Sequence, residues 1–402
     1  MGTARSEERW LCPVSAGIAR VKTRHLWTYD VRPGSLFRIP PTPDNVMLDV
    51  TWSCNQRCGF CYQPALRSRR GHPETGTLVS IVRRLAQWGV AEVLYLGGEP
   101  LLHPGIEEVL QTGASLGLRQ RLVTNGSRLD SALAQRLSCI GLGVGVSLHG
   151  SNARTHDALA GRPGSFELAI AALAAIHNAK GLAWVQYSPT RHNADQMISL
   201  ADLLRTRFGP TVRFVDVNRL LPFGQAADEG RGLLLDEEGW WQALREVVTL
   251  ATMGWEVRVE SVPRCWVRRQ AARDRLSSEQ TNAILSALRP CWMAVTQLAL
   301  DPEGRIKLCP GGPPLGPSIL DMKPKRLWLE APVLNERRRL CFLPHECLDY
   351  ATGRLCGEFY ECVGGCRGAA GITPHASDPL MTPGWQDRSR ASGVAEPASG
   401  GG

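Results

Sequence analysis

The sequence predicts an α/β fold: a partial (β/α)6 barrel of the TIM type, followed by a small C-terminal cysteine-rich domain. Two observations predict it. Short apolar runs rich in β-branched residues alternate with helical patterns over the first 255 residues, and this alternation is typical of parallel βαβ units. Residues 286–370 then hold seven cysteines among many glycines and prolines, a composition typical of a small domain organised around metal.

Six strands and six helices are expected in strict alternation. The strands are predicted at 45–52, 92–97, 119–124, 142–148, 182–188 and 211–217. The helices are predicted at 75–88, 105–116, 129–138, 165–180, 194–207 and 236–253, the last beginning at an N-cap, Asp236. Right-handed βαβ units of this length form either a doubly wound sheet or a barrel, and periodicity alone does not choose between them.

Both architectures place their chemistry at the carboxyl ends of the strands. The unusual residues of this chain fall there: Cys54 after the first strand, Gly97-Gly98-Glu99 after the second, Thr124-Asn125 after the third and Ser147 at the end of the fourth. One rim of the sheet is therefore predicted to carry the functional site.

Composition excludes several classes of protein. The chain has 402 residues, 43% hydrophobic and 21% charged, which is ordinary for a globular protein. It has no apolar run of membrane-spanning length, and its first residues are polar where a secretory signal would be apolar. We expect a cytoplasmic protein without a membrane partner. The net charge of +8 is spread in short clusters, so no nucleic-acid partner is expected.

The expected organisation has five parts. Residues 1–44 form an N-terminal arm, 45–255 the barrel core, 256–285 a linker, 286–371 the cysteine-rich domain and 372–402 a disordered tail.

Three cysteines follow the first strand closely. Cys54, Cys58 and Cys61 have the spacing C-x3-C-x2-C. Three thiolates in one tight loop can hold three irons of a [4Fe-4S] cluster and leave the fourth iron without a protein ligand. The alternatives are a zinc loop, which prefers C-x2-C pairs, or a closed electron-transfer cluster, which needs a fourth cysteine nearby.

This loop, with Phe60 before its last cysteine, resembles the signature of the radical SAM superfamily. The resemblance implies that Cys54, Cys58 and Cys61 bind a [4Fe-4S] cluster whose open iron chelates S-adenosylmethionine. Reductive cleavage of that cofactor then yields a 5'-deoxyadenosyl radical, which abstracts hydrogen from the substrate.

The same family supplies further expectations for the rim. Gly97-Gly98-Glu99-Pro100 looks like its GGEP segment, which holds the methionine amino group of the cofactor. Cofactor contacts are also expected at the strand ends, and the full predicted cofactor-binding set is Phe60, Gly97, Gly98, Glu99, Thr124, Asn125, Ser147 and Arg162.

The cysteine-rich region resembles the SPASM domain, which carries auxiliary iron-sulfur clusters in radical SAM enzymes that mature peptides. Cys291 and Cys309 bracket Gly304 as C-x12-G-x4-C, and Cys356, Cys362 and Cys366 run as C-x5-C-x3-C. The chain departs from the family in two places: Gly353 stands where a cysteine usually precedes Cys356, and no cysteine follows Cys366.

The resemblance implies one or two auxiliary clusters. The predicted ligands are Cys291, Cys309, Cys341, Cys347, Cys356, Cys362 and Cys366. Two clusters held only by cysteine need eight ligands, so Cys265, a non-cysteine residue or an open iron would complete the set. A zinc-stabilised lobe is the alternative.

The resemblance implies a radical SAM oxidoreductase that modifies a peptide or protein side chain oxidatively, for instance by a cross-link, and takes electrons from a donor such as flavodoxin or ferredoxin. Two alternatives stay open: a dehydrogenase or epimerase acting on a small-molecule precursor of a sugar or antibiotic, and a non-catalytic iron-sulfur carrier.

Overall fold

Parallel strands alternate with helices from Asn45 to Thr252, as the sequence predicts. The computed structural model describes residues 39–63, 71–220, 224–227, 232–338, 347–349, 354–357, 359–362, 365–366 and 380–381. The six predicted strands are β1 (Asn45–Asp49), β2 (Glu92–Leu96), β3 (Arg119–Thr124), β4 (Gly143–Ser147), β5 (Leu182–Tyr187) and β6 (Val212–Val217). The six predicted helices are α2 (Thr75–Trp88), α3 (Ile106–Ser115), α4 (Ser131–Cys139), α6 (Ser165–Asn178), α7 (Met197–Phe208) and α8 (Glu237–Thr252).

The sheet continues beyond these six strands. β7 (Glu256–Glu260) and β8 (Leu288–Arg289) extend it in parallel on one side. On the other side β9 (Gln297–Leu300) pairs in parallel with β1, followed by antiparallel β10 (Arg305–Lys307) and β11 (Pro314–Ser318). The order β11-β10-β9-β1-β2-β3-β4-β5-β6-β7-β8 leaves β11 and β8 as edges, so the predicted partial barrel is confirmed.

The predicted linker, residues 256–285, holds regular structure instead. Besides β7 it contains α9 (Arg264–Arg273) and α10 (Ser278–Ala287). The apolar signal is weak here because α9 carries four arginines, although it buries Trp266, Val267 and Ala271. A capping box between Ser277 and Gln280 begins α10.

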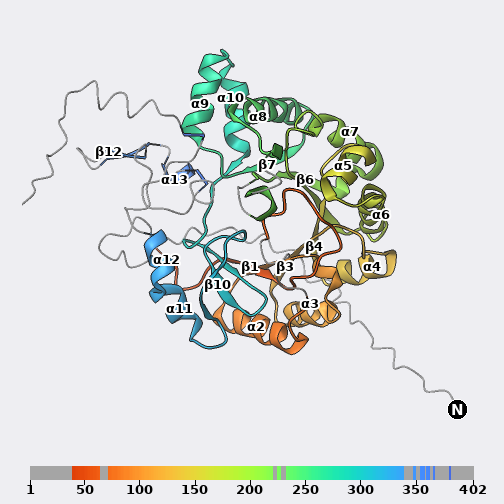
Figure 1. Ribbon diagram of the computed structural model, residues 1–402, viewed down its shortest axis with the longest axis vertical. Coiled ribbons are helices and arrows are strands. Elements are labelled where there is room, and N and C mark those ends of the chain that lie inside the picture. The colour runs from red at the N-terminus through yellow and green to blue at the C-terminus, as the bar shows by residue number, and fades with distance from the viewer. Residues whose placement is uncertain are drawn as a thin grey trace, which may run out of the picture.

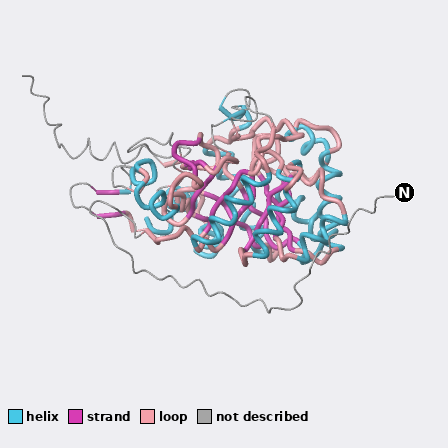
Figure 2. The backbone as a smooth tube through the Cα atoms, turned by 90° about the horizontal axis from the view of Figure 1, so that it is seen from below, coloured by secondary structure: helices cyan, strands magenta, loops and turns pink. Residues whose placement is uncertain are grey.

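The remaining elements are short. They are η1 (Pro100–Leu102), α5 (Ala153–Ala160), η2 (Gly209–Thr211), η3 (Gly224–Ala227), α11 (Pro324–Glu330), α12 (Pro332–Arg337), β12 (Leu348–Asp349), β13 (Arg354–Leu355) and α13 (Phe359–Cys362). In Figure 1 the helices from α2 round to α10 form an arc outside the strands. Figure 2 shows the short β12–β13 pair at one end of the molecule, away from the central strands.

Helix ends follow local sequence rules. The predicted N-cap Asp236 accepts a hydrogen bond from the backbone N–H of Gly239 at 2.9 Å. Asn152 caps α5 in the same way, accepting from Thr155, and α5 ends at Gly161 in the left-handed conformation. These two ends fix α5 beside the loop that follows β1.

Apolar residues form two layers around the barrel wall. The larger core lies between the sheet and its helices, while a smaller cluster of Leu94, Trp184 and Phe214 comes from strands β2, β5 and β6. The rings of Trp184 and Phe214 stack with centroids 5.7 Å apart. Trp184 lies opposite Gly145 of β4 in the sheet register. The glycine provides room for the indole, because a Cβ at Gly145 would lie 2.5 Å from it.

Two of the predicted terminal segments are mostly outside the described residues. Of the arm at 1–44 only residues 39–44 are described, and of the tail at 372–402 only Leu380 and Met381. Both of these tail residues are buried, Leu380 in the main core and Met381 against Val295, Cys347 and Phe359. The domain boundaries therefore stay predictions.

Among the described helices, none alone has the length and apolar composition needed to cross a membrane. Only α5 and α6 taken together, bent by 104° where they meet, reach that threshold. Much of α6 is buried in the main core.

We predict that Gly145→Ala lowers the free energy of unfolding by about 1–3 kcal/mol, because the added methyl overpacks the indole of Trp184. Gly143→Ala is the matched control, since its Cβ would meet Trp184 at an ordinary 3.4 Å. Urea unfolding of the two variants measures the difference. Equal stability of the two variants would contradict the packing of the barrel interior described above.

Candidate functional site

The three cysteines of the C-x3-C-x2-C motif lie on an irregular loop that follows β1 directly. Its backbone is held from several sides by neighbouring strand and helix ends. The backbone N–H of Gly98 donates to the Thr51 carbonyl at 2.9 Å, and that of Glu99 donates to the Ser53 carbonyl at 2.8 Å. The Gly-Gly-Glu segment after β2 therefore fixes the residues immediately before Cys54.

Gly97 makes this close approach possible. Its φ of +129° is one that L side chains rarely adopt, and a Cβ there would lie 2.7 Å from the Thr51 carbonyl oxygen. A glycine is needed here for the path of the backbone, whatever else binds nearby.

Glu99 is buried at 1% exposure, and its carboxylate is surrounded by donors. It accepts from the backbone N–H of Leu101 at 3.0 Å, the Thr124 hydroxyl at 2.6 Å and the backbone N–H of Asn125 at 2.7 Å. Burial raises the pKa of this carboxyl, and the three hydrogen bonds oppose the rise. The structure thus brings Glu99, Thr124 and Asn125 together and ties the end of β2 to the end of β3.

Asn125 extends this network to the cysteine loop. Its side-chain N–H donates to the Asn55 amide oxygen at 2.8 Å, and Asn55 in turn donates to the Ser127 hydroxyl at 2.8 Å. Sequence reasoning missed Asn55. Its position between Cys54 and Cys58 could have indicated this role, because an amide side chain there can form hydrogen bonds with the strand ends and hold the cysteine loop.

The end of α5 holds the same loop from another side. The backbone N–H of Arg57 donates to the Ala160 carbonyl at 3.0 Å, and a Cβ at Gly161 would lie 2.4 Å from the Arg57 carbonyl oxygen. The Arg162 guanidinium donates to the Asn55 carbonyl at 3.4 Å. The structure therefore places Arg162 against the cysteine loop, and its role in binding the cofactor stays a prediction.

Phe60 is 8% exposed and packs edge-on against His149, with ring centroids 4.8 Å apart. His149 follows β4 and stacks on His156 of α5, whose Nδ1 accepts from the His149 backbone N–H at 3.0 Å. Burial lowers the pKa of His149 to about 3 and that of His156 to about 4. Ser147 lies at the carboxyl end of β4, opposite Gln186 of β5.

The charges of the three thiols affect the pKa values of Cys54 and Cys58. Burial raises the pKa of Cys54 to about 11, with further contributions from the charges of Glu99 and Cys61. Burial also raises the pKa of Cys58, and the charges of Cys61 and Cys54 add to it. All three are free of disulfides. Partly buried thiols with raised pKa values are a donor set suited to a metal that keeps them deprotonated.

The donor set consists of three cysteine thiols on one loop. Within the described residues, no group of three or more His, Cys, Asp or Glu side chains is placed to hold one metal ion. The thiolate ligands of a cubane bind different irons and therefore stand farther apart than the ligands of one zinc. Three thiols on one loop fit the cluster implied by the sequence.

The cysteines after residue 286 fall into two groups. Burial raises the pKa of Cys309 to about 12, and the charges of Cys366 and Cys291 add to it. Cys347 and Cys356 pack in one small apolar cluster with Phe359, and the Cys362 sulfur accepts a hydrogen bond from the Arg264 backbone N–H at 3.4 Å. Cys341 lies outside the described residues.

Comparisons with known proteins agree with this site. Residues 49–204 match the model of the radical SAM superfamily, a span that includes the cysteine loop and the Gly-Gly-Glu segment. The chain carries a radical SAM domain. It is therefore an enzyme, and its cofactors are an iron-sulfur cluster and S-adenosylmethionine.

Two curated relatives extend the likeness beyond the radical SAM domain. Mycofactocin maturase MftC of Mycobacterium ulcerans is 26% identical over 349 residues, covering 84% of this chain and 87% of the relative. AdoMet-dependent heme synthase of Methanosarcina barkeri is 23% identical over 336 residues, covering 82% and 92%.

Among solved structures, Streptococcus suis SuiB bound to its precursor peptide SuiA superposes with a TM-score of 0.65. It is 16% identical and the match covers 85% of this chain and 76% of that chain. The two chains share a fold that extends well past the radical SAM domain.

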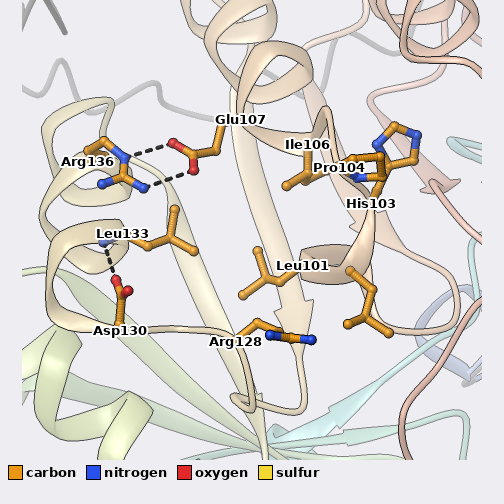
Figure 3. A pocket seen from close by; sticks show the side chains of 10 residues that line it. Leu101, His103, Pro104, Ile106, Glu107, Arg128, Asp130, Leu133 and Arg136 are labelled. Atoms are coloured by element: carbon orange, nitrogen blue, oxygen red, sulfur yellow. Dashed lines mark hydrogen bonds and ion pairs between the residues drawn. The ribbon is translucent and has the colours of Figure 1, made fainter. Parts of the chain in front are cut away.

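The pocket of Figure 3 lies on η1, α3 and α4 and is lined by none of the predicted cofactor residues. Its acidic groups are paired within the protein: Glu107 binds the Arg136 guanidinium at 2.7 and 2.9 Å, and Asp130 caps α4 at Leu133. A second cavity adjoins the cysteine loop at Gly59 and is lined by α5, His192 and Leu233. The first pocket therefore lies apart from the predicted cofactor residues.

We predict that protonation of His156 lowers the free energy of unfolding as the pH falls. Its folded-state pKa, about 4, lies below the unfolded value near 6.5, so between these values only the unfolded chain takes up the proton. At pH 5 the loss is about 2 kcal/mol relative to pH 8. The test measures the unfolding free energies of the native chain and of His156→Gln. The difference between them should shrink as the pH falls from 8 to 5. A constant difference would contradict a buried neutral histidine.

Proposed function

We propose that this radical SAM enzyme installs an oxidative modification, such as a cross-link, in a side chain of a peptide or protein. The observation that carries the proposal is the cysteine loop fixed against the Gly-Gly-Glu segment and the end of β3. The substrate class is supported by the relatives: one is named a maturase, and the structural neighbour SuiB holds a precursor peptide.

Each predicted cofactor residue has a proposed place in this function. Cys54, Cys58 and Cys61 would hold three irons of the [4Fe-4S] cluster. The backbone of Gly97 and Gly98 with Ser147, Arg162 and Phe60 would surround S-adenosylmethionine. Together these cofactors supply a 5'-deoxyadenosyl radical that abstracts hydrogen from the substrate.

Glu99, Thr124 and Asn125 have a second proposed task beside cofactor contact. The carboxylate of Glu99 accepts only three hydrogen bonds from the described residues, which leaves capacity for an ammonium group of the cofactor. Thr124 and Asn125 hold that carboxylate in place. These residues would orient the cofactor by keeping the rim rigid.

The proposal includes an electron supply and an electron exit. A flavodoxin or ferredoxin in the cytoplasm would reduce the cluster. Auxiliary clusters in a SPASM-like region at 286–371 would remove the electron left when a substrate radical becomes a cross-link. A non-catalytic carrier would not need these cofactor-binding features at the rim.

A small-molecule substrate is the second candidate. The relative from Methanosarcina barkeri is named a heme synthase and covers nearly the same length of this chain as the maturase. A radical SAM dehydrogenase or epimerase of a small-molecule precursor would share the cysteine loop and rim.

We predict that Cys58→Ala abolishes 5'-deoxyadenosine formation from S-adenosylmethionine under strong reductant, because two thiolates on the loop cannot hold the cluster. Cys139→Ala is the matched control, since Cys139 is an exposed cysteine at the end of α4. Chromatography of the anaerobically reconstituted proteins measures the product. Continued cleavage by Cys58→Ala would overturn the mechanism.

The substrate class is tested separately. We expect a short peptide encoded beside this chain to lose two hydrogen atoms in mass when incubated with the native enzyme, S-adenosylmethionine and reductant. Unchanged peptide alongside active cofactor cleavage would favour the small-molecule alternative.

A further inference from the structure

The cysteine-rich region departs from the SPASM pattern at two positions, and the structure brings other cysteines to Cys356 and Cys362. Gly353 occupies the place of the cysteine expected shortly before Cys356, and no cysteine follows Cys366. The first gap lies just before Cys356, and the second lies after Cys366.

A hairpin fills the first gap. Strands β12 and β13 pair antiparallel, with Leu348 opposite Leu355 and Asp349 opposite Arg354. Continuing this register by one residue sets Cys347 opposite Cys356, and the Cys356 backbone N–H donates to the Cys347 carbonyl at 2.9 Å. Residues opposite each other in such a pair project to the same face with Cβ atoms about 5 Å apart. Two cysteines nine positions apart thus become neighbours.

The start of α9 brings a further cysteine to Cys362. The backbone N–H of Arg264 donates to the Cys362 sulfur at 3.4 Å, and the Arg264 guanidinium binds the Glu361 carboxylate at 2.7 Å. These two contacts fix the first turn of α9 against α13, which ends at Cys362. Cys265 is the next residue of that turn.

The Cys265 thiol interacts with the same group. The charges of Cys362 and Cys356 act on it, so the three sulfurs lie within electrostatic range of one another. The backbone N–H bond to Cys362 is also of the kind that stabilises sulfur ligands of iron-sulfur clusters.

We propose that Cys265 is a protein ligand of an auxiliary iron-sulfur cluster that it shares with Cys347, Cys356 and Cys362. Cys291, Cys309 and Cys366 belong to a different site. The assignment rests on the proposed auxiliary clusters but not on the identity of the substrate. It makes the residues between the barrel core and the cysteine-rich region part of a metal site rather than a connection between two parts.

The first test uses the native chain and needs no substitution. Cys265 and Cys139 are both exposed, so a thiol-alkylating reagent should reach both in the metal-free protein. In the anaerobically reconstituted protein we expect Cys265 to be protected at least tenfold while Cys139 still reacts. Mass spectrometry of the digested protein reads each site, and equal labelling of Cys265 with and without iron would overturn the assignment.

The second test uses iron counting and pairs of variants. Cys265→Ser should lose about four irons per chain, as should Cys362→Ser. The double variant should lose no more than either single one, because both residues hold the same cluster. Adding Cys309→Ser to Cys265→Ser should double the loss. Full iron content in Cys265→Ser with an unchanged electron paramagnetic resonance spectrum would contradict the proposal.

These readouts separate this inference from the proposed function. Protection of Cys265 and the iron count do not depend on cofactor cleavage or on any substrate. A chain that forms no 5'-deoxyadenosine but protects Cys265 would leave the assignment intact and refute the function. A chain that cleaves the cofactor but does not protect Cys265 from alkylation would refute the assignment and leave the proposed function intact.

Discussion

The buried carboxylate of Glu99 is the contact on which the rim of this barrel depends. It accepts hydrogen bonds from Leu101, Thr124 and Asn125, and so it joins the ends of β2 and β3 beyond their last residue pair in the sheet, Tyr95 and Leu122. Losing one of these donors would leave buried charge without compensation, at a cost of about 1–3 kcal/mol. Because the same segment gives its backbone N–H groups to Thr51 and Ser53, the position of Cys54 follows from it.

The cysteine loop itself has no regular structure and buries few of its own side chains, yet it is held firmly. Backbone bonds reach it from the Gly-Gly-Glu segment and from α5, and the Gln225 backbone N–H donates to the Cys61 carbonyl at 2.8 Å. Each partner comes from a different part of the chain. The three cysteines are therefore aligned only when these distant parts of the barrel have folded around the loop. We expect metal binding to depend on the folded barrel rather than on the loop alone.

The sequence predicted the barrel strands, their helices and the cysteine loop because each carries a local signal: apolar periodicity, a cap such as Asp236, or cysteine spacing. It did not predict Asn55 as a loop anchor, because the bond depends on Asn125 being seventy residues away. It also read residues 256–285 as a linker, because the arginines of α9 hide its apolar face. The neighbours of Cys265 depend on a hairpin register and a helix start, neither of which has a signature in spacing alone.

A buried ion pair connects the radical SAM domain to the C-terminal cysteines. Lys307 of β10 donates to Asp49 of β1 at 2.7 Å, and both side chains are almost inaccessible to solvent. Burial raises the pKa of both Cys61 and Cys309; the charge of Asp49 adds to the rise at Cys61, and the charge of Lys307 opposes it at Cys309. Since β9 also pairs directly with β1, the C-terminal region is an extension of the barrel sheet. The ion pair therefore joins the strand that leads into the cysteine loop to the strand that precedes Cys309.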